Sequence, residues 1–562
     1  MTTPALTALQ RTKDRHGEGC AAVKLALLHT LAHAPLRTAA EVLRLHEALC
    51  YLRAYPDDAA VLAVVERMLR RFHRRADLRQ HREELADSGI AGTAIRYRFF
   101  WATACWFAER WPGLFKLDRD SDETGRKIAA ALPLLLSPAE AAALRQLDLT
   151  GFAAIDRVRK GAGNAASDAA FWVRLVEHMP GDTFTRQDFH DRIDAAYVLL
   201  PGAGTPSRTH AWCAAAPAAF QTAPLARDRP DLREEIRRPP CTVRPLSARE
   251  GGAIVELARA AMVTRGRDLD AFAYGDPRDV RVVEFDDGLA FVAIGMRPER
   301  RLLVESVYGF LTIKNGVPIG YVLAAAVNES AEMAYNVFDT WRGHEAAHIY
   351  GRALAATASL LGAKAFSAPP YQLGHDNAEG LASGAWWFYQ KLGFKPRDPA
   401  VVRLVERELA KMRRKPGYRS SVETLQELSS VDMFLERGAP RPDIVGVFPL
   451  GALGLAITDS LARRFGADRE GGLDVCQEEA ARALAVRGLE TWSADERLAF
   501  RRWAPLVGIL PGIDRWTAGE RAALAAVIRA KGARYESDYV RAYNAHGKLR
   551  SALLRLARAA AT

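Results

Sequence analysis

A histidine pair in the middle of the chain has the spacing of a zinc site. His344 and His348 flank Glu345 in an HExxH pattern, which on a helix presents two imidazoles to a metal and a carboxylate to its bound water. The pattern continues to Gly351, but Leu354 stands where a third histidine ligand is expected. The other candidates for a third ligand lie in a distant loop, at His375 and Glu379.

The same residues can also bind an anion. A helix that begins just after Gly343 leaves the amides of His344 through Ala347 without intrahelical acceptors. Together with the helix dipole, these amides suit a pyrophosphate. The strand that precedes the turn ends near Val337 and Phe338, where its backbone edge can pair with an amide-rich ligand arm.

The elements that position this turn alternate between strands and helices. A strand over 241–247 is followed by a helix, and turn residues predict hairpins at Asp287-Gly288 and Asn315-Gly316. Hydrophobic periodicity then predicts, in order, a strand, a helix, a strand and a helix. These four elements span 332–338, 344–362, 364–369 and 383–393.

This order resembles the fold of the GCN5-related N-acetyltransferase (GNAT) superfamily. Gly316–Val322 resembles the family's G-x-x-x-G strand, and Asn336–Gly343 resembles the strand that enters its Q/R-x-x-G-x-G/A turn. Ala385–Phe394, AWWFYQKLGF, resembles its late A-x-x-[FL]-Y-x-K-x-G-F segment, the most specific of these motifs. The resemblance covers residues 241–398.

The resemblance implies an acyl-CoA-dependent N-acyltransferase that moves an acyl group to a small-molecule or protein amine. Acetyl-CoA or another acyl-CoA would be the co-substrate, and no metal is expected. Tyr389 would be the general acid that protonates the departing thiolate, and Glu332 and Glu305 are the candidates for the base. The acyl-CoA would contact Val337, Phe338, Arg342, Gly343, His344, Glu345, Ala346, Ala347 and Asn377.

Two positions depart from the family pattern. Glu345 replaces the middle glycine of the turn, where a carboxylate opposes a pyrophosphate. Ala382 stands where the family often has an asparagine, and Asn377 is the nearest substitute. An inactive GNAT-like binding or scaffold protein is therefore the alternative function. A zinc hydrolase that uses His344 and His348 is the third.

The flanking regions predict a multidomain protein. Residues 1–200 show helical periodicity, with helix starts at Asp57-Asp58 and Ser137-Pro138, and predict an all-α domain. Residues 201–240 are rich in proline and predict a connector. Residues 241–398 form the GNAT-like α/β domain with a mixed sheet, and 399–562 predict an α-helical C-terminal region.

Composition restricts the compartment and the partners. The net charge is +11, with cations concentrated in 67–75 and 411–415, but no nucleic-acid motif accompanies them, so nucleic acid is not an expected partner. The longest uncharged run, 444–458, is too short for a bilayer, so no membrane is expected. The six cysteines lack a CxxC pair, and Met1–Gly19 lacks a secretory core, which favours the cytoplasm. The oligomeric state stays open.

Overall fold

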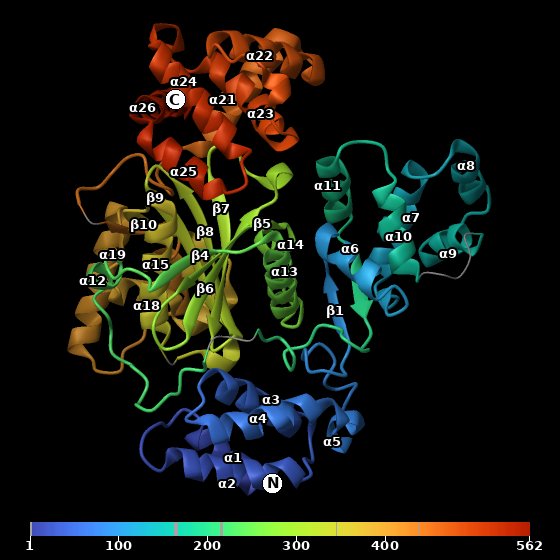
Figure 1. Ribbon diagram of the computed structural model, residues 1–562, viewed down its shortest axis with the longest axis vertical. Coiled ribbons are helices and arrows are strands. Elements are labelled where there is room, and N and C mark those ends of the chain that lie inside the picture. The colour runs from blue at the N-terminus through green and yellow to red at the C-terminus, as the bar shows by residue number, and fades with distance from the viewer. Residues whose placement is uncertain (1–2, 162–166, 214–216, 344, 437, 562) are drawn as a thin grey trace.

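The computed structural model describes residues 3–161, 167–213, 217–343, 345–436 and 438–561. A nine-stranded sheet lies at the centre of Figure 1, with one helical bundle below it, a second lobe beside it and a third group of helices above it. The prediction of a large mixed sheet between two mainly helical regions is confirmed.

The lower bundle is stabilised by helix caps that the sequence provides. Thr38 accepts the amide of Glu41 at the start of one helix, and Asp58 accepts the amide of Val61 at the start of the next. The predicted start at Asp57-Asp58 is therefore confirmed. The bundle consists of α1 (Pro4–Thr12), α2 (Cys20–His33), α3 (Ala39–Ala54), α4 (Ala59–Arg71), η1 (Phe72–Arg74) and α5 (Ala76–Gln80).

The second lobe contains a small antiparallel sheet, so the prediction of an all-α domain over 1–200 was wrong in this part. The sheet has the order β1-β3-β2, from β1 (Ile95–Arg98), β2 (Phe115–Leu117) and β3 (Ala196–Leu199). These strands are too short to show a period of two in the sequence. The surrounding helices are α6 (Trp101–Arg110), α7 (Asp122–Ala131), η2 (Leu132–Leu134), α8 (Pro138–Gln146), α9 (Phe152–Lys160), α10 (Asp168–Glu177) and α11 (Thr183–Ile193).

The connector is fixed against the hairpin turn at Asn315-Gly316. The Asn315 side chain accepts the amide of Ala219 at 2.9 Å and donates to the Ala54 carbonyl at 2.8 Å. A Cβ on Gly316 would lie 1.9 Å from the Cys213 carbonyl, so only glycine fits there. The described part of the connector includes the short helix α12 (Leu232–Glu235).

The central sheet has the order β11-β12-β10-β9-β8-β7-β6-β5-β4, and it is antiparallel except where β9 and β10 run parallel. Positive φ angles at Asp287 and Asn315 confirm the two predicted hairpin turns. The strands are β4 (Thr242–Pro245), β5 (Gly275–Glu284), β6 (Leu289–Met296), β7 (Ser306–Lys314), β8 (Val317–Val327), β9 (Ser330–Val337), β10 (Ala365–Ala368), β11 (Lys395–Pro396) and β12 (Met433–Glu436).

Helices pack on both faces of this sheet. On one face the ring of Tyr335 in β9 lies 5.1 Å from that of Tyr350 in α15 (Ala346–Leu361). On the other, Phe272 of α14 (Asp270–Ala273) lies 6.0 Å from Tyr321 of β8, next to α13 (Ala248–Val263). The segment after β10 forms α16 (Pro370–Leu373), α17 (Ala378–Ser383) and α18 (Ala385–Lys391).

The sheet extends past the boundary predicted at 398. β12 inserts between β10 and β11, although α19 (Pro399–Arg414) and α20 (Val422–Leu428) precede it in the chain. Its four residues carry no strand signal strong enough to stand out among helices. Residues 399–436 therefore belong in part to the sheet, which corrects the prediction that 399–562 is wholly helical.

The upper helices are attached to the sheet through buried polar contacts. Ser306 donates to Glu536 of α25 at 3.0 Å, and Tyr308 accepts the amide of Ser537 at 2.8 Å. In the part of the chain that the structure describes, no helix is long and apolar enough to cross a bilayer. The upper helices are α21 (Leu450–Phe465), α22 (Arg469–Ala483), α23 (Ala494–Ile509), α24 (Ala518–Lys531), α25 (Glu536–Ala545) and α26 (Gly547–Ala561).

Candidate functional site

The parallel strands β9 and β10 separate after three residue pairs. Ser330, Ala331 and Glu332 are the Cα partners of Ala365, Phe366 and Ser367. β10 then ends at Ala368, and the chain turns into α16, whereas β9 continues to Val337. The edge of β9 beyond Glu332 therefore faces a gap between the two strands.

Side chains fill part of this gap. Phe338 donates to Ile319 of β8, so by alternation the backbone groups of Tyr335 and Val337 face away from β8, toward the gap. The Tyr335 carbonyl accepts from the Gln372 amide at 2.7 Å, and the Val337 carbonyl accepts from Arg342 at 3.1 Å. The Val337 backbone therefore faces the gap as predicted, but its carbonyl is occupied by Arg342. Phe338 is instead buried, with Arg265 3.9 Å from its ring.

Tyr389 approaches the gap from α18. Its ring is buried between Tyr350 and Phe394, 5.4 and 5.3 Å away. Burial raises the pKa of the Tyr389 hydroxyl, although nearby Gln372, the Tyr335 carbonyl and Tyr350 oppose this rise. Among the described residues the hydroxyl has no partner in hydrogen-bonding geometry. It is a protonated donor at neutral pH without a fixed acceptor.

Glu332 lies at the point where the strands separate. Its position in β9 alternates with that of Tyr335, so its side chain projects from the face opposite α15. Burial raises the pKa of Glu332 to about 7, and the charges of Asp432 and Glu305 add to this rise. Burial also raises the pKa of Glu305, which directly precedes β7, while the Lys531 charge opposes it. Of the two predicted base candidates, Glu332 is the one at the gap.

The sheet face that carries Glu332 is only partly covered. Five side chains of β8 and β9 on this face are half-buried, although Tyr321 and Val327 on it are buried, whereas Tyr335, Met333 and Ala324 on the α15 face are buried. A ligand can therefore reach Glu332 from solvent. The half-buried positions are Leu323, Ala325, Glu332, Ala334 and Asn336.

The first turn of α15 contains amides without a backbone acceptor among the described residues. Ile349 donates to the Glu345 carbonyl at 2.9 Å, whereas no described acceptor faces the amides of Ala346, Ala347 and His348. Gly343 has φ +80°, and a Cβ added there would meet no described atom within 4 Å. The helix thus begins at the predicted turn, and anion binding there stays a prediction. His344 lies outside the described residues.

The Glu345 side chain is directed toward the lower bundle. Burial raises the pKa of Tyr55 in α3 well above its ordinary value, and Glu345 adds to this by charge and by a hydrogen bond. Burial lowers the pKa of Lys314, and the Glu345 charge opposes this shift. The Lys314 ammonium also lies 5.1 Å from the centre of the Tyr55 ring. The carboxylate in the glycine's place therefore lies close to a buried cation.

Two other predicted contacts are engaged within the protein. Arg342 forms ion pairs with Glu379 and, at 2.8 Å, with Asp339. Asn377 caps α17, accepting the Gly380 amide at 3.1 Å. An acyl-CoA contact at Asn377 would require this cap to open.

Of the predicted metal ligands, His344 lies outside the described residues, and His348, His375 and Glu379 have partners elsewhere. His348 pairs with Asp228 of the connector at 3.1 Å, and His375 lies 3.7 Å from Asp376. Glu379 is held by Arg267 and Arg342. Within the described ranges, no group of three or more histidine, cysteine, aspartate or glutamate side chains could hold a metal ion.

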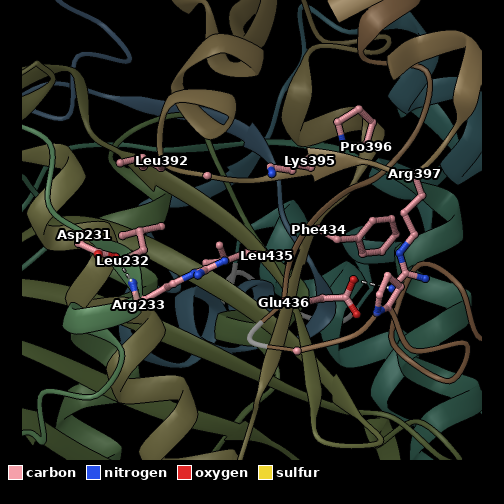
Figure 2. A pocket seen from close by; sticks show the side chains of 13 residues that line it. Asp231, Leu232, Arg233, Leu392, Lys395, Pro396, Arg397, Phe434, Leu435 and Glu436 are labelled. Carbon is pink, nitrogen blue, oxygen red and sulfur yellow. Dashed lines mark hydrogen bonds and ion pairs between the residues drawn. The ribbon is translucent and has the colours of Figure 1, made fainter. Parts of the chain in front are cut away.

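A separate cavity of about 680 Å³ lies at the edge of the sheet, between α12 and strands β11 and β12. In Figure 2 Arg397 extends beside Phe434 and Glu436; its guanidinium lies 4.5 Å from the ring centre and 2.7 Å from the carboxylate. The predicted site residues are absent from the described lining of this cavity. The gap and the cavity are thus different places in the fold.

Comparisons with protein-family models, with curated proteins and with solved structures give no match to this chain. The function is therefore inferred from the site.

Sequence reasoning missed three residues at the gap: Ser367, Gln372 and Asp432. Gln372 stood in a loop of unassigned polar residues, and Asp432 belonged to a segment predicted to be helical. Only the pairing of β12 with β10 brings Asp432 beside the end of β10. The sequence carries no local signal for that pairing.

Proposed function

We propose that the protein is an acyl-CoA-dependent N-acyltransferase of the GNAT type. The observation that carries the proposal is the separation of β9 from β10 directly after the Glu332–Ser367 pair. Beyond this pair the edge of β9 has no neighbouring strand, so an extended acyl-pantetheine arm can pair with it after displacing Gln372 and Arg342, with a carboxylate at one end of the gap. The partly open face beside Glu332 provides access for an amine.

Each residue at the gap has a role in direct transfer. Glu332 and Val337 lie in the same strand, roughly 16 Å apart, so the Glu332 carboxylate takes a proton from the acceptor ammonium through intervening water, and the freed nitrogen attacks the thioester carbonyl. The Val337 amide, which faces the gap, stabilises the developing oxyanion. The nitrogen–carbon bond forms as the carbon–sulfur bond breaks, and the Tyr389 hydroxyl gives its proton to the departing thiolate.

The first turn of α15 supplies the pyrophosphate site. The amides of Ala346, Ala347 and His348, which have no backbone acceptor among the described residues, and the open backbone at Gly343 suit an anion. Lys314 lies near Glu345 and partly offsets the repulsion that this carboxylate exerts on a phosphate. We therefore expect the protein to bind CoA with reduced affinity and not to lose CoA binding altogether.

Isothermal titration of the full chain with acetyl-CoA and with CoA tests the proposal. We expect a dissociation constant in the micromolar to millimolar range. A turnover assay that follows free thiol release with a mixture of primary amines then tests catalysis. The absence of both heat and thermal shift at millimolar acetyl-CoA would refute the proposal.

A non-catalytic GNAT-like binding protein is the second candidate. It is favoured by the engaged carbonyls of Tyr335 and Val337, which an incoming pantetheine would have to displace. CoA binding without thiol release for any amine would support this candidate against the transferase.

A further inference from the structure

We infer that the acceptor is an amine with at least one further positive charge, a diamine or polyamine, bound by Glu332 and Asp432 beside Ser367 and by Glu305 two strands further along the sheet. The assignment of Glu332 as base rests on the proposed function. The binding of the cation does not, because it depends only on this face of the sheet.

The sheet register places a hydroxyl between two of the carboxylates. Ser367 is the Cα partner of Glu332 on one side and of Phe434 on the other, so these three side chains share one face. Asp432 stands two positions before Phe434 and therefore projects to the same face. Ser367 is 1% exposed, and in the described part of the chain its hydroxyl has no hydrogen-bond partner. Buried hydroxyls are normally satisfied, so this one indicates an absent ligand.

The three carboxylates carry no counter-ion of their own. None of Glu305, Glu332 and Asp432 forms an ion pair with another described residue, the nearest opposing charge being Lys531 beside Glu305. Burial raises the pKa of all three, and mutual repulsion adds to the rise at Glu332. A cation between them would remove this repulsion. The N–H donors of one alkylammonium can bond to the Glu332 carboxylate and the Ser367 hydroxyl, which leaves Asp432 and Glu305 for a second charge.

The surface between the carboxylates suits an alkyl chain. Glu332 pairs with Ala325, and Ala325 pairs with Val307, which lies two positions after Glu305. Two strand spacings and two residues separate the Cα atoms of Glu332 and Glu305 by roughly 12 Å. The half-buried side chains between them are small and apolar. A linear polyamine can thus lay its methylene groups across Ala325 while its nitrogens meet the acids at either end.

The acceptor needs a second positive charge because only one of the three carboxylates takes part in catalysis. Once Glu332 has taken a proton from the reacting nitrogen, Asp432 and Glu305 remain ionisable acids beside the bound molecule. A monoamine leaves both without a partner. A second ammonium pairs with one of them and fixes the direction of the chain.

Calorimetric titration of the full chain, without CoA, tests this inference with 1,4-diaminobutane, spermidine and 1-aminobutane as probes. We expect the diamine and spermidine to bind at least about tenfold more tightly than the monoamine. Cation binding should also release protons from the carboxylates, so the heat should depend on the ionisation enthalpy of the buffer. Equal affinities for the monoamine and the diamine would overturn the inference.

Two variants locate the site. Asp432→Asn should weaken diamine binding about tenfold and change monoamine binding less than threefold. Ser367→Ala should weaken both, because it removes the hydroxyl acceptor. The matched control is Glu406→Gln, an exposed acid on α19, which should change neither. An unchanged diamine affinity in Asp432→Asn, with a thermal midpoint like that of the wild type, would refute the placement.

The two hypotheses fail differently. Diamine binding without acetyl-CoA binding would reject the proposed transferase and keep the cation site. Acetylation of monoamines and diamines with the same kcat/KM would keep the transferase and reject the cation site.

Discussion

Glu332 and Ser367 form the last residue pair of the parallel strands β9 and β10. One side chain is a carboxylate with its pKa raised to about 7, and the other is a buried hydroxyl without a hydrogen-bond partner among the described residues. Both project from the face opposite α15. The candidate reactive region therefore begins where the pairing of β9 with β10 ends.

Replacement of Glu332 should separate catalysis from cofactor binding. Glu332→Gln keeps the shape and hydrogen-bonding capacity of the side chain but removes the base, so kcat should fall by roughly 10²–10⁴. The affinity for acetyl-CoA should stay within about twofold, measured by calorimetry. Glu406→Gln, an exposed acid on α19, is the matched control and should leave kcat unchanged. Equal losses in both variants would argue against Glu332 as the base.

The pH profile should report the ionisation of Glu332. Its pKa is raised to about 7, so the carboxylate is protonated and inactive as a base below that pH. We expect kcat/KM to rise through a single ionisation near pH 7 and then level off. The affinity for acetyl-CoA should stay constant across the same pH range. A kcat/KM that stays constant from about pH 5.5 to about pH 8 would contradict this assignment.

Removal of the Tyr389 hydroxyl should affect turnover more than stability. Tyr389→Phe keeps the packed ring and deletes a hydroxyl that has no described hydrogen-bond partner, so the thermal midpoint should change little. The kcat for thioester substrates should fall by roughly 10- to 1000-fold. Tyr350→Phe is the control, since that hydroxyl is buried in the same cluster but belongs to α15. A similar loss of turnover in both variants would indicate a structural effect.

Neutralisation of Glu345 should strengthen CoA binding. Glu345→Gln removes a negative charge beside the first turn of α15 and leaves Asp287 as the remaining acid whose charge acts on Lys314. We expect the dissociation constant of CoA to fall by roughly tenfold at low salt, with a smaller effect at high salt. Asp376→Asn, which removes an exposed charge in the loop before α17, should leave it unchanged. A weaker affinity in Glu345→Gln would show that the carboxylate assists binding.

The titration of Asp268 should make the free energy of unfolding fall as the pH rises. Burial raises its pKa to about 7, while hydrogen bonds from the Phe100 amide and Thr103 oppose the rise. The native state therefore binds a proton that the unfolded chain loses near pH 4, and this stabilisation is lost as the pH rises through 7. Asp268→Asn should remove a pH-dependent contribution on the order of 4 kcal/mol, measured by denaturant unfolding from pH 4 to 8. Asp148→Asn, at an exposed position, should retain it.

Local signals predicted the framework of the central region well. Asp287-Gly288 and Asn315-Gly316 adopt the positive φ angles that hairpin turns require, and such turns are encoded by the residues themselves. The helix start at Ser137 is a capping box with Glu140, also a local feature. What the sequence could not indicate was pairing between distant segments. β12 joins β10 across two intervening helices, and Asp432 reaches the acidic face only through that pairing.

The sequence likewise predicted only part of the candidate site. Tyr389 was found because its helix carries a specific motif, and it does lie at the gap. Glu345 was found as an acid in an unfavourable place, but its proximity to Lys314 and Tyr55 depends on how α3 packs below the sheet. Asn377 was assigned to the cofactor from its residue type, whereas its side chain caps α17. Helix caps and ligand contacts use the same residue types, so composition alone does not separate them.

The contacts of Asn315 have a consequence for dissecting the protein. This residue joins a hairpin turn to the connector through Ala219 and to α3 through Ala54. A chain beginning at residue 241 would lose both partners, and Lys314 would lose Tyr55 as its neighbour. The boundary between connector and sheet that the sequence predicts at residue 241 is therefore not a boundary between independently folding domains. Cleavage there should leave two fragments that remain associated, and neither should fold as a soluble unit without the other.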